Sequence, residues 1–154
     1  MSKVMMSLLT AIAWTVLSLP VYAQADRPLI NLADVAEARI EAQGATTWRR
    51  VDADRDDALV MTVTAGDDYP GLSIRPEGEF WNLTDYQAVA MTVTNVGDQP
   101  ARVHLRIDNP GDWRKSPWSV NAVQLQPGQT RTVRTRFGQS YGHQSFKLDP
   151  AKIY

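Results

Sequence analysis

The chain has 154 residues, with 16 lysines and arginines against 17 aspartates and glutamates and a formal net charge of -1. This balance argues against nucleic acid or an anionic membrane surface as a non-specific partner, and is compatible with a neutral, hydroxyl-rich ligand. The chain has no cysteine, which excludes disulfides, thiolate metal sites and cysteine nucleophiles.

The first residues predict an export signal. Met1–Lys3 carries a positive charge, Val4–Val21 is almost wholly apolar, and Ala23–Ala25 has the small residues that a signal peptidase requires. We therefore expect a signal peptide over residues 1–25, a secreted or periplasmic location, and no membrane association after cleavage. An uncleaved membrane anchor is the alternative. Residues 26–154 are long enough for one domain with one core.

Several segments after the leader alternate apolar and polar residues with the period of a half-buried β-strand. The predicted strands are Leu59–Thr64, Gly71–Arg75, Val89–Thr94, Val103–Asp108, Val120–Leu125 and Thr130–Phe137, with further strand structure within Arg39–Val51. Glycine and proline mark turns between them, as in Asn95–Pro100, Asn109–Asp112 and Gln126–Gln129. A single helical turn is expected over Leu32–Glu37.

Many short strands joined by tight turns predict an all-β protein, an antiparallel β-sandwich with a jelly-roll-like arrangement. The C-terminus is an exception to the pattern. Phe146–Leu148 resembles a strand, the chain turns at Asp149–Pro150, and a new apolar segment begins at Ile153. We therefore expect a sandwich that lacks its last strand, because the chain is a fragment or because another molecule supplies that strand.

Catalytic motifs are absent from the sequence, which contains no phosphate-binding glycine loop, zinc-binding helix or nucleophile elbow. The two histidines are His104, on the polar side of a predicted strand, and His143, in a glycine-bounded loop near Ser140. Acids that a glycoside hydrolase would need lie at turns and strand ends, where acids are common. These are Glu77, Glu79, Asp108 and Asp112. We expect no catalysis by this chain on its own and no cofactor.

The acidic segment Asp52–Asp57 begins like a calcium-binding loop, because carboxylates at alternate positions can converge on one cation. An EF-hand is excluded, since Asp57 replaces the required glycine and Val63 replaces the bidentate glutamate. A solvated acidic hairpin and a looser structural calcium site remain the two interpretations.

The tryptophans suggest a ligand. Trp48 and Trp81 lie among apolar residues and are expected in or beside the core. Trp113 and Trp118 instead flank a polar loop after the most regular strand. Indole faces stack on the C–H faces of pyranose rings, and nearby polar groups bind the hydroxyls. The alternative is that the loop folds back and buries one of these tryptophans over the core.

Six segments together resemble the non-catalytic sandwich domain that precedes the catalytic barrel of secreted agarase-type β-glycosidases. They are Tyr69–Gly71, Phe80–Tyr86, Val93–Gly97, Val103–Gly111, Leu125–Thr130 and Leu148–Ile153. The resemblance implies a domain similar to jelly-roll carbohydrate-binding modules, with the hydrolytic carboxylates in a separate downstream domain.

We therefore expect a secreted module that binds agar or another β-linked polysaccharide, as the N-terminal accessory part of such an enzyme. Trp113 and Trp118 are the expected stacking platforms. The expected polar or flanking contacts are Arg106, Asp108, Asn109, Asn121 and Tyr141. Two alternatives remain: a structural sandwich that docks a partner catalytic domain without binding sugar, and a small glycoside hydrolase.

Overall fold

The computed structural model describes residues 27–51, 58–64, 66, 69–138 and 147–154. The chain divides into two compact units, Met1–Ile30 and Asn31–Tyr154. Most of the first unit, including the expected signal peptide, lies outside the described residues. The fold described below is that of the second unit.

The prediction of an all-β, antiparallel, sandwich-like fold is confirmed. Its elements are η1 (Glu37–Arg39), β1 (Ile40–Gln43), β2 (Thr46–Arg50), β3 (Leu59–Val63), β4 (Gly71–Ile74), β5 (Ala88–Thr94), β6 (Ala101–Asp108), β7 (Trp118–Leu125), β8 (Thr130–Arg136) and η2 (Pro150–Lys152). Each strand predicted between Arg39 and Phe137 is present, and the Arg39–Val51 region contains two. The expected helical turn near Leu32–Glu37 is replaced by the short 3-10 turn η1, which begins later in the chain.

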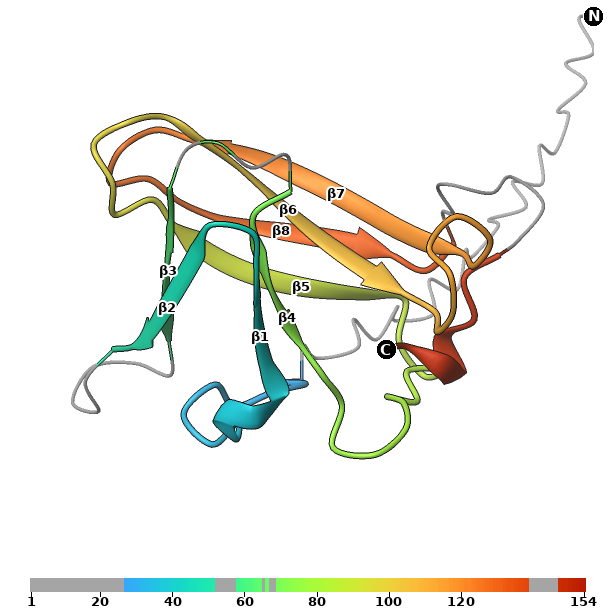
Figure 1. Cartoon of the computed structure of the whole chain (residues 1–154). Helices are drawn as coiled ribbons and strands as arrows, with labels where there is room; N and C mark the ends of the chain where they lie inside the picture. Colours follow the sequence, from blue (N-terminus) through green and yellow to red (C-terminus); the bar gives the residue numbers. More distant parts are fainter. Residues whose placement is uncertain (1–26, 52–57, 65, 67–68, 139–146) are drawn as a thin grey trace, which may run out of the picture. The chain divides into compact units, whose positions relative to one another are not determined.

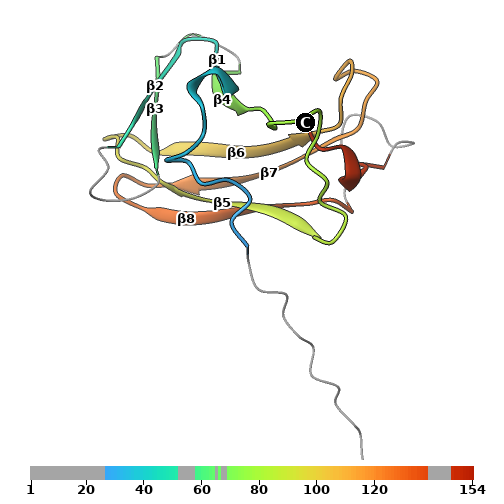
Figure 2. The ribbon, with the colours of Figure 1, turned by 90° about the horizontal axis from the view of Figure 1, so that it is seen from below.

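The strands pair in two nested sets. In the first set β1 pairs with β4, and the intervening β2 and β3 pair with each other. In the second set β5 pairs with β8, and the intervening β6 and β7 pair with each other. All four pairs are antiparallel. Threonine hydroxyls meet across β5 and β8, with 3.1 Å between Thr92 and Thr132 and 2.8 Å between Thr94 and Thr130. In Figure 1, β7 is uppermost and β5 lowest in this group, with β6 and β8 crossing between them, and the four strands remain adjacent in the turned view of Figure 2.

The main core cluster is formed where these two strand pairs meet the C-terminal segment. It contains the buried residues Leu83, Ile107, Phe137, Leu148 and Ile153, against which Trp81, Tyr86 and Val89 pack. Alternate residues of β8 point into the interior. Val133, Thr135 and the following Phe137 are buried, whereas Arg134 and Arg136 are exposed. Trp81 thus occupies the core-edge position expected from its apolar neighbours.

The C-terminal segment closes over this core without forming a strand. Ile153, 1 % exposed, forms an isolated bridge with Trp81, whose N–H donates to the Ile153 carbonyl at 2.9 Å. Asp149 caps η2 by accepting from the N–H of Ala151 at 3.0 Å. Lys147 and Leu148 are not in a strand, so the strand expected over Phe146–Leu148 is absent from its described part. The turn expected at Asp149–Pro150 is the start of η2.

Candidate functional site

The loop between β6 and β7 is held by its own hydrogen bonds. The carbonyl of Asp112 accepts from the N–H groups of Lys115 and Ser116, each at 2.8 Å, and its side chain accepts from the N–H of Arg114 at 3.0 Å. Gly111 adopts a φ of 118°, and a Cβ at this position would collide with the Ser116 hydroxyl. The loop therefore has a defined shape that depends on glycine at its first turn.

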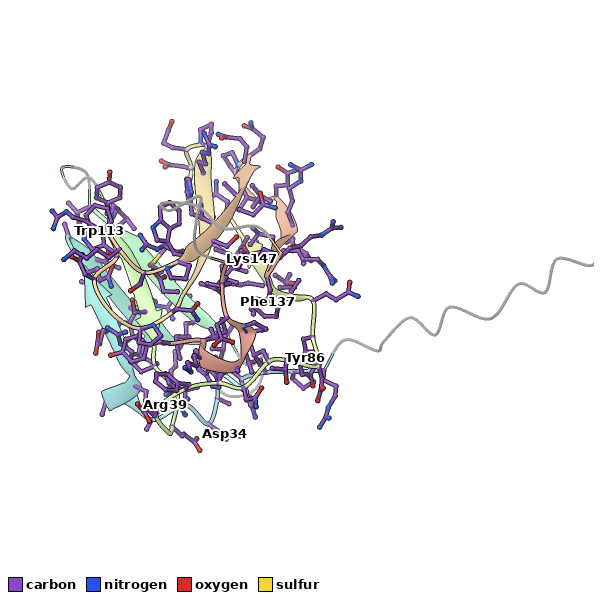
Figure 3. The ribbon with its side chains drawn as sticks, turned by 90° about the vertical axis from the view of Figure 1, so that its right-hand side faces the viewer. Asp34, Arg39, Tyr86, Trp113, Phe137 and Lys147 are labelled. Atoms are coloured by element: carbon purple, nitrogen blue, oxygen red, sulfur yellow. The ribbon has the colours of Figure 1, made fainter. Side chains whose placement is uncertain are left out.

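Trp113 lies on the outside of this loop. Its side chain is 55 % exposed, and the guanidinium of Arg114 stands 4.7 Å from the indole centroid. Figure 3 shows Trp113 toward one edge of the view, whereas Phe137 of the core lies near its centre. The stacked arginine orients the ring. Trp113 is therefore not the tryptophan that the alternative interpretation buries over the core, and that alternative now concerns Trp118 alone.

Trp118 opens β7 and is half-buried. It pairs in register with Asp108, the last residue of β6, and the guanidinium of Arg106 lies 4.6 Å from its ring centroid. Arg106 also forms an ion pair with Asp108, with 2.5 Å between Nη2 and Oδ1. Three of the predicted site residues are thus brought together at one end of β6, on one face of the strand pair.

A further cation–aromatic contact, between Arg75 and Tyr154, lies beside Asp108. The Tyr154 N–H donates to the Asp108 carbonyl at 3.0 Å, and the guanidinium of Arg75 lies 4.3 Å from the Tyr154 ring centroid. Arg75 in turn binds the carboxylate of Glu41 at 2.8 Å. This hydrogen bond, together with the charge of Arg75, lowers the pKa of Glu41, and the same hydrogen bond raises the pKa of Arg75.

We call these six side chains the aromatic–arginine cluster: Arg75 with Tyr154, Arg106 with Trp118, and Arg114 with Trp113. The sequence analysis did not predict Arg114, Arg75 or Tyr154 as site residues. Arg75 is 33 positions from Asp108 in the chain, and no motif relates the two. The one available signal was the position of Arg75 at the end of a predicted strand, which does not show what that end contacts.

The structure assigns Asn109 a different position from the one expected. Asn109 is 8 % exposed, and its Nδ2 donates to the carbonyls of Asp149 at 2.8 Å and Lys152 at 2.7 Å. Its Oδ1 accepts from the N–H of Asp149 at 2.7 Å. Because the whole side-chain amide holds the C-terminal segment, Asn109 is not included in the site proposed below.

Asn121 lies on the opposite face of β7 from Trp118. It pairs with Leu105, on the face opposite that of Arg106 and Trp118, and its Nδ2 donates to the Arg134 carbonyl at 2.9 Å. Tyr141 lies outside the described residues, as do His143 and Ser140. Of the seven predicted site residues, three belong to the aromatic–arginine cluster, namely Trp113, Trp118 and Arg106, and a fourth, Asp108, forms an ion pair with Arg106.

Three of the four acids considered for glycoside hydrolysis make local contacts, and one of these, Asp112, accepts hydrogen bonds within its own loop. Glu77 pairs with Arg39 at 2.8 Å, and Asp108 pairs with Arg106. Within the described ranges, histidine, aspartate and glutamate form no group of three or more suited to a metal ion. The acidic segment Asp52–Asp57, on which the calcium hypothesis rests, lies outside those ranges, so this hypothesis stays a prediction.

No helix in the described part of the chain is long and apolar enough to cross a bilayer. Comparison of the chain with protein-family models, with curated proteins and with solved structures gave no significant match. The resemblance to the accessory domain of agarase-type enzymes therefore stays a prediction.

Proposed function

We propose that this chain is a secreted polysaccharide-binding module for agar or a similar β-linked glycan, and an accessory part of an agarase-type glycoside hydrolase. The observation that carries the proposal is the exposed indole of Trp113 on a hydrogen-bonded loop beside further aromatic and charged groups. Because 55 % of Trp113 stays in water, part of the free energy that full burial would contribute is not realised, and full burial is worth roughly 1.5 to 3 kcal/mol for a large apolar side chain. Ligand binding would recover part of it.

The chemistry of the cluster suits a sugar polymer. The part of the Trp113 indole that is open to solvent offers a flat apolar surface for the C–H face of a pyranose ring. The charged groups of Arg106 and Asp108 lie on one face of the strand pair, and both remain partly exposed. Charged donors and acceptors of this kind make directional hydrogen bonds to hydroxyl groups.

The proposal is tested by affinity electrophoresis of the purified chain through gels containing agarose. The chain is expected to be retarded, and Trp113→Ala is expected to weaken the apparent affinity roughly tenfold. This corresponds to the loss of about 1.5 kcal/mol of stacking. Because Trp113 is largely exposed, the substitution is expected to leave the unfolding midpoint nearly unchanged.

Tyr69→Ala is the matched control, because Tyr69 is an exposed aromatic residue, 87 % accessible, just before β4 and outside the cluster. Its removal is expected to leave retardation unchanged. An unretarded parent chain would rule out agarose as a ligand and favour a purely structural sandwich domain. Equal retardation of the parent and Trp113→Ala would remove Trp113 from the site.

A further inference from the structure

Three polar side chains follow one another along the Trp118 face of β6. In an antiparallel pair, directly opposed residues share a face. Arg106 is opposite Val120, His104 is opposite Ala122, and Arg102 is opposite Gln124. Since Arg106 contacts the Trp118 ring, Arg102 and His104 lie on the same face and extend away from the aromatic–arginine cluster.

We call Arg102, His104 and Arg106 the β6 track. All three side chains are exposed, whereas the opposed Val120 and Ala122 are short and half-buried. Residues two apart on a strand are separated by about 6.7 Å, so the track runs for about 13 Å from Arg102 to Arg106. The length and exposure of the track, and the short side chains of Val120 and Ala122 beside it, suit an extended polymer that lies along the strand.

The positive charge of the track is not fully compensated. Arg106 is paired with Asp108, but Arg102 has no acidic partner in the described part of the chain. The residues that face the track from β7 between Val120 and Gln124 carry no carboxylate. The track therefore carries one guanidinium, that of Arg102, without an acidic partner among the described residues, beside the paired guanidinium of Arg106. Guanidinium groups bind sulfate-like and carboxylate oxygens in bidentate fashion, which neutral hydroxyls do not match.

We propose that the β6 track binds acidic groups, sulfate esters or carboxylates, on the polysaccharide whose sugar rings stack at the Trp113 loop. This inference rests on the proposed function and adds the class of glycan: an acidic polymer is bound in preference to a neutral one. Arg102 is the specificity-determining residue, at the end of the track farthest from the tryptophans.

The test is isothermal titration of the whole chain with three polymers: a sulfated galactan, the same galactan after desulfation, and a polyuronate. The sulfated galactan is expected to bind at least fivefold more tightly than its desulfated form, and its affinity is expected to fall as salt rises. The polyuronate shows whether carboxylates are accepted as well as sulfates.

Arg102→Gln is expected to lower the affinity for the sulfated galactan at least threefold, with no change for the desulfated polymer. Arg136→Gln is the matched control, because Arg136 is also an exposed strand arginine but lies on β8, between the buried Thr135 and Phe137. It changes the net charge equally and is expected to have no effect.

The outcomes separate the two proposals. If none of the polymers binds, the proposed function itself fails. If neutral and sulfated galactans bind equally, and Trp113→Ala abolishes both while Arg102→Gln changes neither, only the acidic preference is overturned. If Arg136→Gln weakens binding as much as Arg102→Gln, the attraction is a general effect of charge and the β6 track is not a site.

Discussion

An asparagine can contact a ligand at the surface or hold two segments together in the interior, and Asn109 illustrates the difference. Beside an aromatic loop, an asparagine is a reasonable contact for sugar hydroxyls, and the sequence predicted that role. In the structure its amide makes three hydrogen bonds to Asp149 and Lys152, which close the C-terminal segment over the core. Burial decides between the roles, because a buried amide must satisfy its hydrogen bonds within the protein.

Replacing this amide is expected to destabilise the fold. Asn109→Ala removes three part-buried hydrogen bonds to the C-terminal segment, at a cost of about 1 to 3 kcal/mol in the free energy of unfolding. Urea denaturation followed by tryptophan fluorescence measures the change. Asn121→Ala is the control, because Asn121 is exposed and its bonds are accessible to water, so a smaller loss is expected. Equal midpoints for Asn109→Ala and the parent chain would contradict the role assigned to Asn109.

Trp113 and Trp118 show what the sequence did resolve at the residue scale. Their placement beside a Pro- and Gly-containing loop left two interpretations open, exposure of both rings or burial of one over the core, and Trp113 is exposed. Trp118 is half-buried beside Arg106, a distinction that the sequence pattern does not contain, since both residues flank the same loop. The difference arises because Trp118 already belongs to β7, where its ring is fixed by the register with Asp108.

At the scale of elements, period-2 alternation was sufficient to find the strands but not their partners. The segments Leu59–Thr64, Val89–Thr94 and Val103–Asp108 match β3, β5 and β6 closely. Strand pairing is a non-local property: β1 pairs with β4 and β5 with β8, across intervening hairpins. Arg75 and Tyr154 were missed for this reason, since their approach depends on where β4 and the C-terminal segment lie beside the end of β6.

The β1–β4 pair carries a pH-sensitive ion pair. Arg75 lowers the pKa of Glu41 in the folded state, so the pair contributes stability above the pKa of an unfolded glutamate, about 4.3. That contribution is lost as the pH falls through the folded pKa, which lies below this value. Since the ion pair is open to solvent, its effect on stability is expected to be small.

Thermal melts between pH 2.5 and pH 6, in steps of about half a unit, measure how the stability of the fold changes as Glu41 is protonated. The parent chain is expected to lose more stability on acidification than Glu41→Gln, which has no carboxylate to protonate at this position. Glu79→Gln serves as the control, because Glu79 forms no ion pair among the described residues. If the pH profiles of the parent and Glu41→Gln have the same shape, the Arg75–Glu41 pair does not form in solution.

For the whole molecule, composition and turn spacing determined the fold class, because few architectures bury many short alternating strands without helices or disulfides. The C-terminal segment was harder to anticipate. Its apolar residue Ile153 signalled a further strand, whereas the structure buries this residue through a single bridge to Trp81 and the η2 turn. An apolar side chain in a sequence indicates burial but does not specify the backbone conformation that achieves it.

The central claim is that a glycan is bound at the Trp113 end of the β6–β7 pair and not elsewhere on the chain. Titrating the isotopically labelled chain with an agarose oligosaccharide, and following its indole N–H signals by NMR, tests this claim directly. The indole N–H signals of Trp113 and Trp118 are expected to shift in a saturable manner, and those of Trp48 and Trp81 are expected to keep their chemical shifts. Shifts confined to Trp48, or no saturable shift at either Trp113 or Trp118, would contradict it.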